Sequence, residues 1–221
     1  MYFSKISLRK DSYALQQLNP YLQKTGYYYH QRMWDLFSEN NPEKKRDFLY
    51  RAEVTDRWPC FYVVSATKPC DNKGIWEIKS KEYSPQIKQN ESLHFRLRTN
   101  PRICRTDENS RKKYYDIVQD AWQKNSEEIK RGEITKIEVV QTAGEEWLNK
   151  KAAQNGFRVD TVIVENFRKE CFNKKQHVVK FSTLDFVGHL TILDAELFLP
   201  ALFHGVGSAK GFGCGLLMVR R

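Results

Sequence analysis

The feature that most restricts the fold of this chain is a glycine-rich segment near its C-terminal end. Five of the 11 glycines lie between Gly205 and Gly215. Glycine adopts positive φ and lets another part of the backbone come close, so this segment is neither a regular helix nor an ordinary strand. It is not a P-loop, because no Gly-Lys-Ser/Thr follows and it leads into an apolar, strand-like run. Two interpretations stay open: backbone amides that bind phosphate, or a helix C-cap followed by a bulged strand.

Length and composition predict a globular chain with one large domain or two small ones. The chain has 221 residues, of which 40% are hydrophobic and 13% aromatic, enough for a packed core. It has no apolar run of about 18 residues that could span a membrane. No long apolar region follows Met1, as a signal peptide would require. We therefore expect a cytoplasmic protein with no membrane partner.

The charge balance favours a polyanionic partner. Lys and Arg number 37 against 27 Asp and Glu, which gives a net charge of +10. Basic side chains that bind phosphates release condensed counterions, and this supplies affinity for nucleic acid. No basic amphipathic helix with a lipid-facing stripe stands out, so nucleic acid ranks above a membrane surface as the partner.

The cysteines and histidines do not form a metal-binding pattern. Five cysteines without a C-x-x-C pair argue against both a disulfide framework and a zinc ribbon, so we interpret them as free thiols. The five histidines are scattered along the chain without metal-ligand spacing. We therefore expect neither a metal site nor a cofactor.

The first part of the chain predicts a small antiparallel sheet. A helix is expected over 27–37, after Thr25 and Gly26, and it should end at Asn40-Asn41-Pro42. A second short helix is expected at 43–49, and strands at 1–8, 50–54, 61–66 and 75–80. This order suits a ferredoxin-like domain at residues 1–88, with the helices on one face of the sheet.

The second part of the chain repeats this kind of strand and helix order after a polar linker at 84–90. A new strand opens at Leu93, where apolar and basic side chains alternate. We expect a basic irregular stretch at 102–113, helices at 114–130, 144–154 and 194–204, and strands at 157–166, 178–181, 186–193 and 214–219. Residues 91–221 are therefore expected to form a second ferredoxin-like domain of the same α+β class.

One predicted helix carries a candidate for proton transfer. Tyr27, His30, Trp34 and Phe37 share one helical face, which by itself indicates a core stripe with a satisfied histidine. The alternative is catalytic, because histidine titrates near neutral pH and can take or give a proton. A place in the first helical turn would favour its neutral form through the helix dipole. Tyr27 could orient the ring or share the proton transfer.

Basic side chains outside this helix form the candidate RNA-binding surface. Two stretches contribute, one after Leu93 and one in a basic hairpin near 168–175; either is also compatible with a solvated charged face. Arg32 lies on another face of the histidine helix, and Lys210 lies inside the glycine-rich segment. The RNA-binding candidates are Arg32, Arg96, Arg98, Arg102, Arg105, Arg168, Lys169, Lys174, Lys175, Gly207 and Lys210.

Six blocks in the same order resemble the CasE family, the CRISPR repeat-processing endoribonucleases of the Cascade complex. The blocks are Met1-Tyr2-Phe3-Ser4-Lys5, His30-Gln31-x-x-Trp34-x-Leu36-Phe37, Arg46-Asp47-Phe48-Leu49-Tyr50, Phe95-Arg96-Leu97-Arg98-Thr99-Asn100-Pro101, Gly188-His189-Leu190-Thr191-Ile192, and the segment from Gly205 to Leu217. Thr99 stands where the family has a small Ala. Residues 102–140 show little similarity to the family. The hairpin near 168–175 is similar to the family's in position more than in residue identity.

The resemblance implies two tandem ferredoxin-like domains and metal-independent cleavage of a hairpin-forming repeat RNA. It places His30 at the family's catalytic position and Tyr27 at that of its supporting tyrosine. The implied partners are CRISPR repeat RNA, the mature crRNA and the other Cascade subunits. We expect the glycine-rich segment to shape the RNA path, with Lys210 contacting a phosphate, while the helix of the first domain carries out the cleavage.

The expected chemistry is attack of a 2′-OH on the adjacent phosphorus, with departure of the 5′-oxygen. His30 would act as general base on the hydroxyl or as general acid on the leaving oxygen, and the sequence does not choose between them. The products would carry a 2′,3′-cyclic phosphate (or 3′-phosphate) and a 5′-hydroxyl. Two other classes remain: a non-catalytic RNA-binding subunit of a ribonucleoprotein complex, and a basic structural protein. An ordinary RRM is disfavoured, because no RNP-type aromatic signature occurs.

Overall fold

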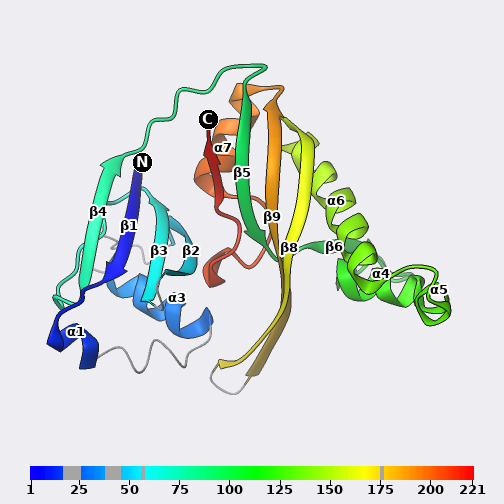
Figure 1. The fold of residues 1–221 in the computed structure, drawn as a ribbon, viewed down its shortest axis with the longest axis horizontal. Coiled ribbons are helices and arrows are strands. Elements are labelled where there is room, and N and C mark those ends of the chain that lie inside the picture. Colours follow the sequence, from blue (N-terminus) through cyan, green and yellow to red (C-terminus); the bar gives the residue numbers. More distant parts are fainter. Residues whose placement is uncertain (17–25, 38–45, 56–57, 175–176) are drawn as a thin grey trace.

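The chain forms two four-stranded antiparallel sheets that stand side by side, each with helices packed against it (Figure 1). The structure is a computed structural model, and it describes residues 1–16, 26–37, 46–55, 58–174 and 177–221. Every strand of the first sheet lies before residue 83, and every strand of the second begins after residue 91. The predicted α+β class with paired antiparallel sheets is therefore confirmed, while the domain limits 1–88 and 91–221 stay a prediction.

The first sheet has the strand order β2-β3-β1-β4. Its elements are β1 (Tyr2–Leu8), α1 (Ser12–Gln16), α3 (Gly26–Asp35), β2 (Phe48–Thr55), β3 (Trp58–Ser65) and β4 (Trp76–Glu82). Ile6, Phe61 and Val63 of the sheet pack against Met33 of α3 in one buried cluster. This burial stabilises α3 against the sheet and determines which of its faces remains open.

The second sheet has the order β10-β5-β9-β8, which is the same arrangement as the first. Its elements are β5 (Ser92–Thr99), α6 (Lys136–Gln154), β8 (Phe157–Lys174), β9 (His177–Ile192), α7 (Ala195–His204) and β10 (Leu217–Arg220), which follow the ferredoxin-like succession of strands and helices. Phe95, Phe186 and Leu190 of the sheet pack with Leu148 of α6 and Phe198 of α7. The inward alternation at Leu93, Phe95 and Leu97 is thus confirmed.

The basic stretch after β5 is not irregular, as the sequence predicted, but a two-stranded hairpin. Strands β6 (Arg102–Thr106) and β7 (Lys112–Asp116) pair, and helices α4 (Ile117–Lys124) and α5 (Ser126–Arg131) follow. Asp107 accepts backbone hydrogen bonds across the turn and so closes it. The helix predicted at 114–130 therefore begins only at Ile117, capped by Asp116.

Three further boundaries differ from the prediction. Residues 48 and 49 of the expected second helix belong to β2, and residues 43–45 lie outside the described residues. Helix α6 begins at Lys136 rather than near 144, because Thr135 and Glu138 form a capping box. The strands expected at 157–166, 178–181 and 186–193 are two continuous strands, β8 and β9, paired from Phe157 to Lys174.

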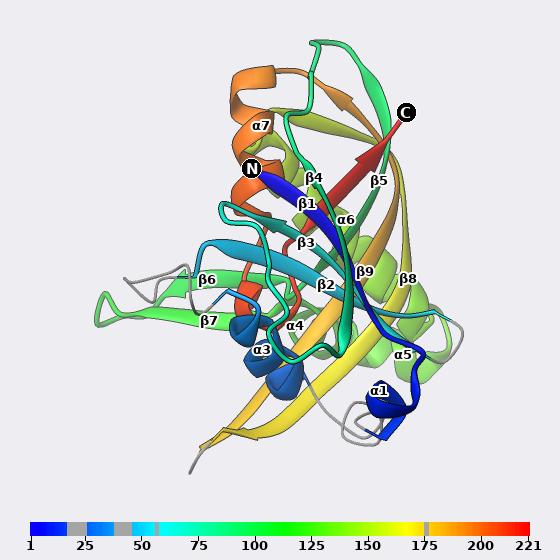
Figure 2. The same ribbon diagram turned by 90° about the vertical axis from the view of Figure 1, so that its left-hand side faces the viewer.

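The paired ends of β8 and β9 extend well beyond the other strands of their sheet, toward the side of the molecule that holds α3 (Figures 1 and 2). Strand β8 contacts α3 there. A second link between the two halves is a small apolar cluster of Leu49, Val64 and Leu216. The first contact lies at α3, whereas the apolar cluster lies on the opposite face of the first sheet, because Leu49 and Val64 alternate along their strands with Tyr50 and Val63, which pack on the α3 side. In the described ranges, no helix is long and apolar enough to cross a membrane.

Candidate active site and nucleic-acid interface

His30 lies on α3 with both ring nitrogens in hydrogen bonds. Its Nδ1 is 2.6 Å from the carbonyl oxygen of Gly211, and the indole N–H of Trp34 donates to Nε2 at 3.2 Å. Because α3 begins at Gly26, His30 is its fifth residue and lies past the first turn. The side-chain and carbonyl contacts therefore orient the imidazole more directly than the helix dipole does.

The glycine-rich segment folds as a series of tight bends that bring a carbonyl to His30. Gly205, Gly207, Gly213 and Gly215 all have positive φ, and a short 3-10 turn, Lys210–Phe212, lies between them. This short turn, η2, contacts α3 and β2. The sequence predicts separate tasks for the segment and for the histidine helix, but the structure joins them in one site.

Phe212 connects His30 to the long hairpin of β8 and β9. Its ring centroid lies 5.5 Å from that of His30, 5.0 Å from that of Phe172 and 5.7 Å from that of Phe181. Phe172 is on β8 and Phe181 is on β9. One aromatic cluster therefore links the histidine, the glycine-rich segment and the basic hairpin.

Positive charge surrounds the same turn. A Cβ atom added to Gly211 would lie 3.6 Å from both Nη1 of Arg46 and the imidazole of His30, so the guanidinium and the histidine flank this glycine. Burial lowers the pKa of Arg46 below its ordinary value. Partial burial, together with the charges of Arg46 and Lys151, also lowers the pKa of Lys210. A phosphate that bound beside His30 would meet these cations.

A cavity of about 380 Å³ lies next to this cluster, between the two sheets. Tyr29 and Phe212 line it on the His30 side, while Arg98 and Arg168 line it from the second sheet. Glu53 and Val54 border both this cavity and a neighbouring one of about 640 Å³ that reaches Arg96. The two cavities thus follow the junction of the sheets, away from His30 toward Arg96.

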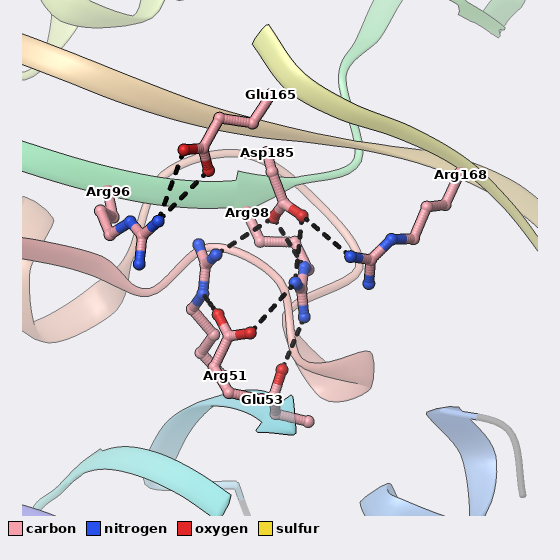
Figure 3. Close-up of polar contacts among 8 residues, drawn as sticks. Arg51, Glu53, Arg96, Arg98, Glu165, Arg168 and Asp185 are labelled. Carbon is pink, nitrogen blue, oxygen red and sulfur yellow. Dashed lines mark hydrogen bonds and ion pairs between the residues drawn. The ribbon is translucent and has the colours of Figure 1, made fainter. Parts of the chain in front are cut away.

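The wall of this cavity contains a buried ionic cluster that joins the two sheets (Figure 3). Asp185 of β9 accepts two hydrogen bonds from Arg98, at 2.7 and 3.0 Å, and forms an ion pair with Arg51 of β2 at 3.3 Å. Arg51 also pairs with Glu53. Arg98 donates to the carbonyl of Ala52 across the junction. Burial opposes the charge of Arg98, but Asp185 raises its pKa above the ordinary value.

Arg96, Arg98 and Arg168 are the predicted RNA-binding residues that lie nearest this junction. Arg98 is 11% exposed, pairs with Asp185 within the second sheet and donates to the carbonyl of Ala52 in the first, so the structure gives it a role in joining the sheets. Arg96 is half-exposed and contacts Glu165 at 3.3 Å. Arg168 is also half-exposed and reaches Asp185 at 3.6 Å from the cavity. Arg96 and Arg168 thus keep accessible charge, and the RNA contacts of all three stay predictions.

Four further RNA-binding candidates do not line the cavity beside the His30 cluster: Arg32, Arg102, Arg105 and Lys169. Arg32 pairs with Asp35 at 2.9 Å on α3. Arg102 stacks over Tyr114, and Arg105 binds Asp120 through two hydrogen bonds of 2.7 Å. Lys169 on β8 lies over the ring of Trp122, 5.6 Å from its centroid. The side chains of Tyr27 and Lys174, and Lys175 as a whole, lie outside the described residues.

Gly207 and Lys210 are held by the protein itself. A Cβ on Gly207 would lie 2.1 Å from Thr99 Oγ1, because this glycine packs directly on β5. Lys210 donates from Nζ to the carbonyl of His204 at 2.7 Å, at the end of α7. These contacts attach the segment to the second domain, and the contact of either residue with a phosphate stays a prediction.

Alanine variants at two glycines should distinguish the tightly packed part of this segment from the part with space for a side chain. Gly207→Ala meets Thr99 and needs a φ of +88°, so we expect it to destabilise the fold by about 1–3 kcal/mol. Gly211→Ala has its nearest neighbours at 3.6 Å and should change stability little. Thermal melting of both variants measures this, and equal melting temperatures would contradict the proposed packing of Gly207.

Four residues at the site were not assigned a role from the sequence: Trp34, Arg46, Tyr50 and Phe212. Trp34 was placed on the His30 face as a core residue, and Arg46 was noted only within a matching block. Tyr50 is buried, and its hydroxyl donates to the Gly211 carbonyl at 3.3 Å. The spacing of Trp34, four residues after His30, could have indicated a contact between them. Arg46, Tyr50 and Phe212 come close to the site around His30 and Gly211 only through tertiary folding.

Among the residues that the structure describes, no three His, Cys, Asp or Glu side chains gather as a group that could hold a metal ion. The site consists of an oriented imidazole, adjacent cations, an aromatic cluster and a cavity between two ferredoxin-like sheets. This combination fits a protein that handles a polyanion and moves a proton.

Comparisons with known proteins identify the family of this chain. A protein family described as "CRISPR associated protein" matches residues 1–221. The CRISPR system Cascade subunit CasE of Escherichia coli (strain K12) is 32% identical over 193 residues, which cover 86% of this chain and 89% of that protein. The chain therefore belongs to the CRISPR-associated protein family that includes CasE.

Two solved structures show the same fold. The crystal structure of Cas6e from E. coli K-12 has a TM-score of 0.66 and 26% identity, with 99% of this chain and 98% of that one covered. Thermus thermophilus Cse3 bound to an RNA that represents a pre-cleavage complex has a TM-score of 0.69 and 22% identity, with 100% and 98% covered. Both likenesses extend over the whole chain, so the fold of both sheets is that of these proteins.

Proposed function

We propose that this protein is an endoribonuclease that binds the hairpin of CRISPR repeat RNA and cleaves the precursor to give crRNA. The observation that carries the proposal is the place of His30, where α3, the glycine-rich turn and the β8–β9 hairpin meet. Arg46 lies beside the same turn, and Arg98 and Arg168 line the adjacent cavity. Kinship with a Cascade subunit supports assembly with other Cascade subunits in the cytoplasm.

The proposed chemistry needs no metal ion. The enzyme would hold the 2′-oxygen, the phosphorus and the 5′-oxygen in line, move protons through His30 and neutralise the phosphate with nearby cations. Tyr27 is proposed to support His30 from the preceding turn of α3. The basic side chains of the β8–β9 hairpin, Arg168, Lys169, Lys174 and Lys175, are proposed to clamp the RNA backbone. The accessible cation Arg96 would extend that contact along the junction of the sheets.

Cleavage of repeat RNA in the presence of a chelator tests this function. With excess EDTA we expect the same cleavage rate as with Mg²⁺, and products that end in a 2′,3′-cyclic phosphate or 3′-phosphate and a 5′-hydroxyl. Mass spectrometry of the product ends distinguishes these groups from a 3′-hydroxyl and 5′-phosphate. Loss of cleavage in EDTA at unchanged RNA binding would overturn metal independence.

A non-catalytic RNA-binding subunit is the competing function. The observation in its favour is that both ring nitrogens of His30 are already hydrogen-bonded within the protein. In that case the protein would bind repeat RNA with normal affinity but would produce no fragments in EDTA or with divalent ions. The same assay, combined with a binding measurement, therefore separates the two functions.

A further inference from the structure

The hydrogen bonds of His30 define which nitrogen carries its proton. A carbonyl oxygen only accepts, so the short contact with Gly211 requires a hydrogen on Nδ1. An indole N–H only donates, so Trp34 requires a lone pair on Nε2. Together the two contacts select the neutral imidazole that is protonated on Nδ1.

Both partners of the imidazole are held in place by further contacts. Trp34 follows His30 by one turn of α3, and its ring packs edge-on against Phe48 with centroids 5.4 Å apart. The Gly211 carbonyl also accepts from the buried hydroxyl of Tyr50. The orientation of the ring therefore depends on α3, β2 and the glycine-rich turn at once.

This arrangement acts against protonation of the ring at Nε2. A hydrogen on Nε2 would face the indole N–H of Trp34, and two donors would oppose each other. A hydrogen bond to the neutral form of a group disfavours its charged form. The contact with Trp34 thus keeps the resting imidazole ready to accept a proton rather than to give one.

We propose that Trp34 is a positioning residue that, with the Gly211 carbonyl, makes His30 the general base of the cleavage reaction through Nε2. This inference rests on the proposed endoribonuclease function and assigns the direction of proton transfer at His30. The hydroxyl of the RNA takes the place of the indole N–H as the donor to Nε2. The Gly211 carbonyl then accepts from the imidazolium that forms, and this charge-assisted hydrogen bond stabilises it.

The reaction balances with water as the only other reactant. Nε2 takes the proton of the 2′-OH while the 2′-oxygen forms its bond to phosphorus. The bond from phosphorus to the 5′-oxygen breaks, and that oxygen leaves with the electron pair and takes a proton from water. The imidazolium returns its proton to the hydroxide formed, which restores neutral His30 and one water molecule.

The pH–rate profile of Trp34→Phe tests the proposal, because phenylalanine keeps an aromatic ring but has no N–H. For a general base the rate falls on the acid side, where the base becomes protonated. In the free enzyme, where Trp34 donates to Nε2, loss of this hydrogen bond to the neutral ring should move the acid limb of kcat/KM to higher pH by about half a unit to one unit. The alkaline limb should not change. A shift of the alkaline limb instead, or of neither limb, would overturn the proposal.

A matched variant controls for the general loss of an indole. Trp58→Phe removes an indole at the start of β3 rather than on α3, and its pH–rate profile should equal that of the wild type. Circular dichroism and RNA affinity show that each variant is folded.

A second measurement does not depend on any variant. Nitrogen-15 NMR of the wild-type protein should show His30 protonated on Nδ1 at neutral pH, and an Nε2-protonated ring would overturn the inference. If the wild-type protein cleaves no repeat RNA, the proposed function fails, whereas the NMR result still decides whether Trp34 and Gly211 set the tautomer.

Discussion

Replacement of His30 by alanine is expected to lower the single-turnover rate of repeat RNA cleavage by about 10²- to 10⁴-fold, the usual contribution of one general acid or base. RNA affinity should change little, because most of it is expected to come from phosphate contacts of other, basic side chains. The ring of His30 is half-buried and is not part of the apolar clusters of the two sheets, so the fold should persist. Gel-based cleavage assays and filter binding at one fixed salt concentration measure the two quantities.

Two controls make this result specific. His189→Ala removes an exposed imidazole on β9 that contacts Thr161 and His94, and it should cleave at close to the wild-type rate. A repeat RNA with a 2′-deoxy nucleotide at the cleavage position should bind to the wild-type protein but remain intact, because the nucleophile is missing. Wild-type cleavage rates for His30→Ala would refute its catalytic assignment, and cutting of the deoxy substrate would refute attack by the 2′-OH.

Of the substitutions proposed as tests of stability, replacement of Asp185 by asparagine should lower the free energy of unfolding the most. Asp185 is 3% exposed and faces Arg98, Arg51 and Arg168 (Figure 3). Asparagine keeps the shape but leaves the buried charges of Arg51 and Arg98 with Glu53 as their remaining acidic partner among the contacts of this cluster. Removal of one partner from a buried ion pair typically costs about 3–5 kcal/mol, since the remaining charge is poorly solvated. For a chain of this size that corresponds to a Tm lower by roughly 6–20 °C.

An exposed ion pair provides the matched comparison. Glu133→Gln breaks the contact with Arg131 after α5, where both side chains are more than half exposed, and should leave the Tm unchanged within error. Differential scanning calorimetry of both variants measures the contrast. Similar small shifts for Asp185→Asn and Glu133→Gln would show that the cluster between the sheets does not hold them together.

Strand alternation and helix capping predicted much of the fold, because both depend on interactions between residues that are close in sequence. The alternation in Leu93, Phe95 and Leu97 predicted a strand with one buried face, and Asp194 predicted the start of α7. The helix with His30 was also predicted within two residues of its observed ends. Thr135 and Glu138 carried an equally local signal for the start of α6, a capping box, which the prediction did not use.

Two errors arose where pairing with a second strand decides the structure. Residues 102–113 are rich in charge and poor in apolar alternation, so they indicated an irregular stretch, yet β6 and β7 pair along their whole length. Residues 167–174 are likewise strand because β9 pairs with them, and their own composition indicated only a basic hairpin loop. Strand formation depends on a partner's hydrogen bonds, which a single segment does not encode.

By itself, the sequence determined the α+β class, the apolar faces of the principal strands, the helix that carries His30 and the unusual backbone of the glycine-rich segment. The tertiary structure decided what these elements do together. His30 and Gly211 are 181 residues apart, and their hydrogen bond exists only because the second sheet presents η2 to α3. The tautomer of His30, the cations beside it and the cluster around Asp185 all depend on such distant contacts, whose geometry arises only when both sheets pack against each other.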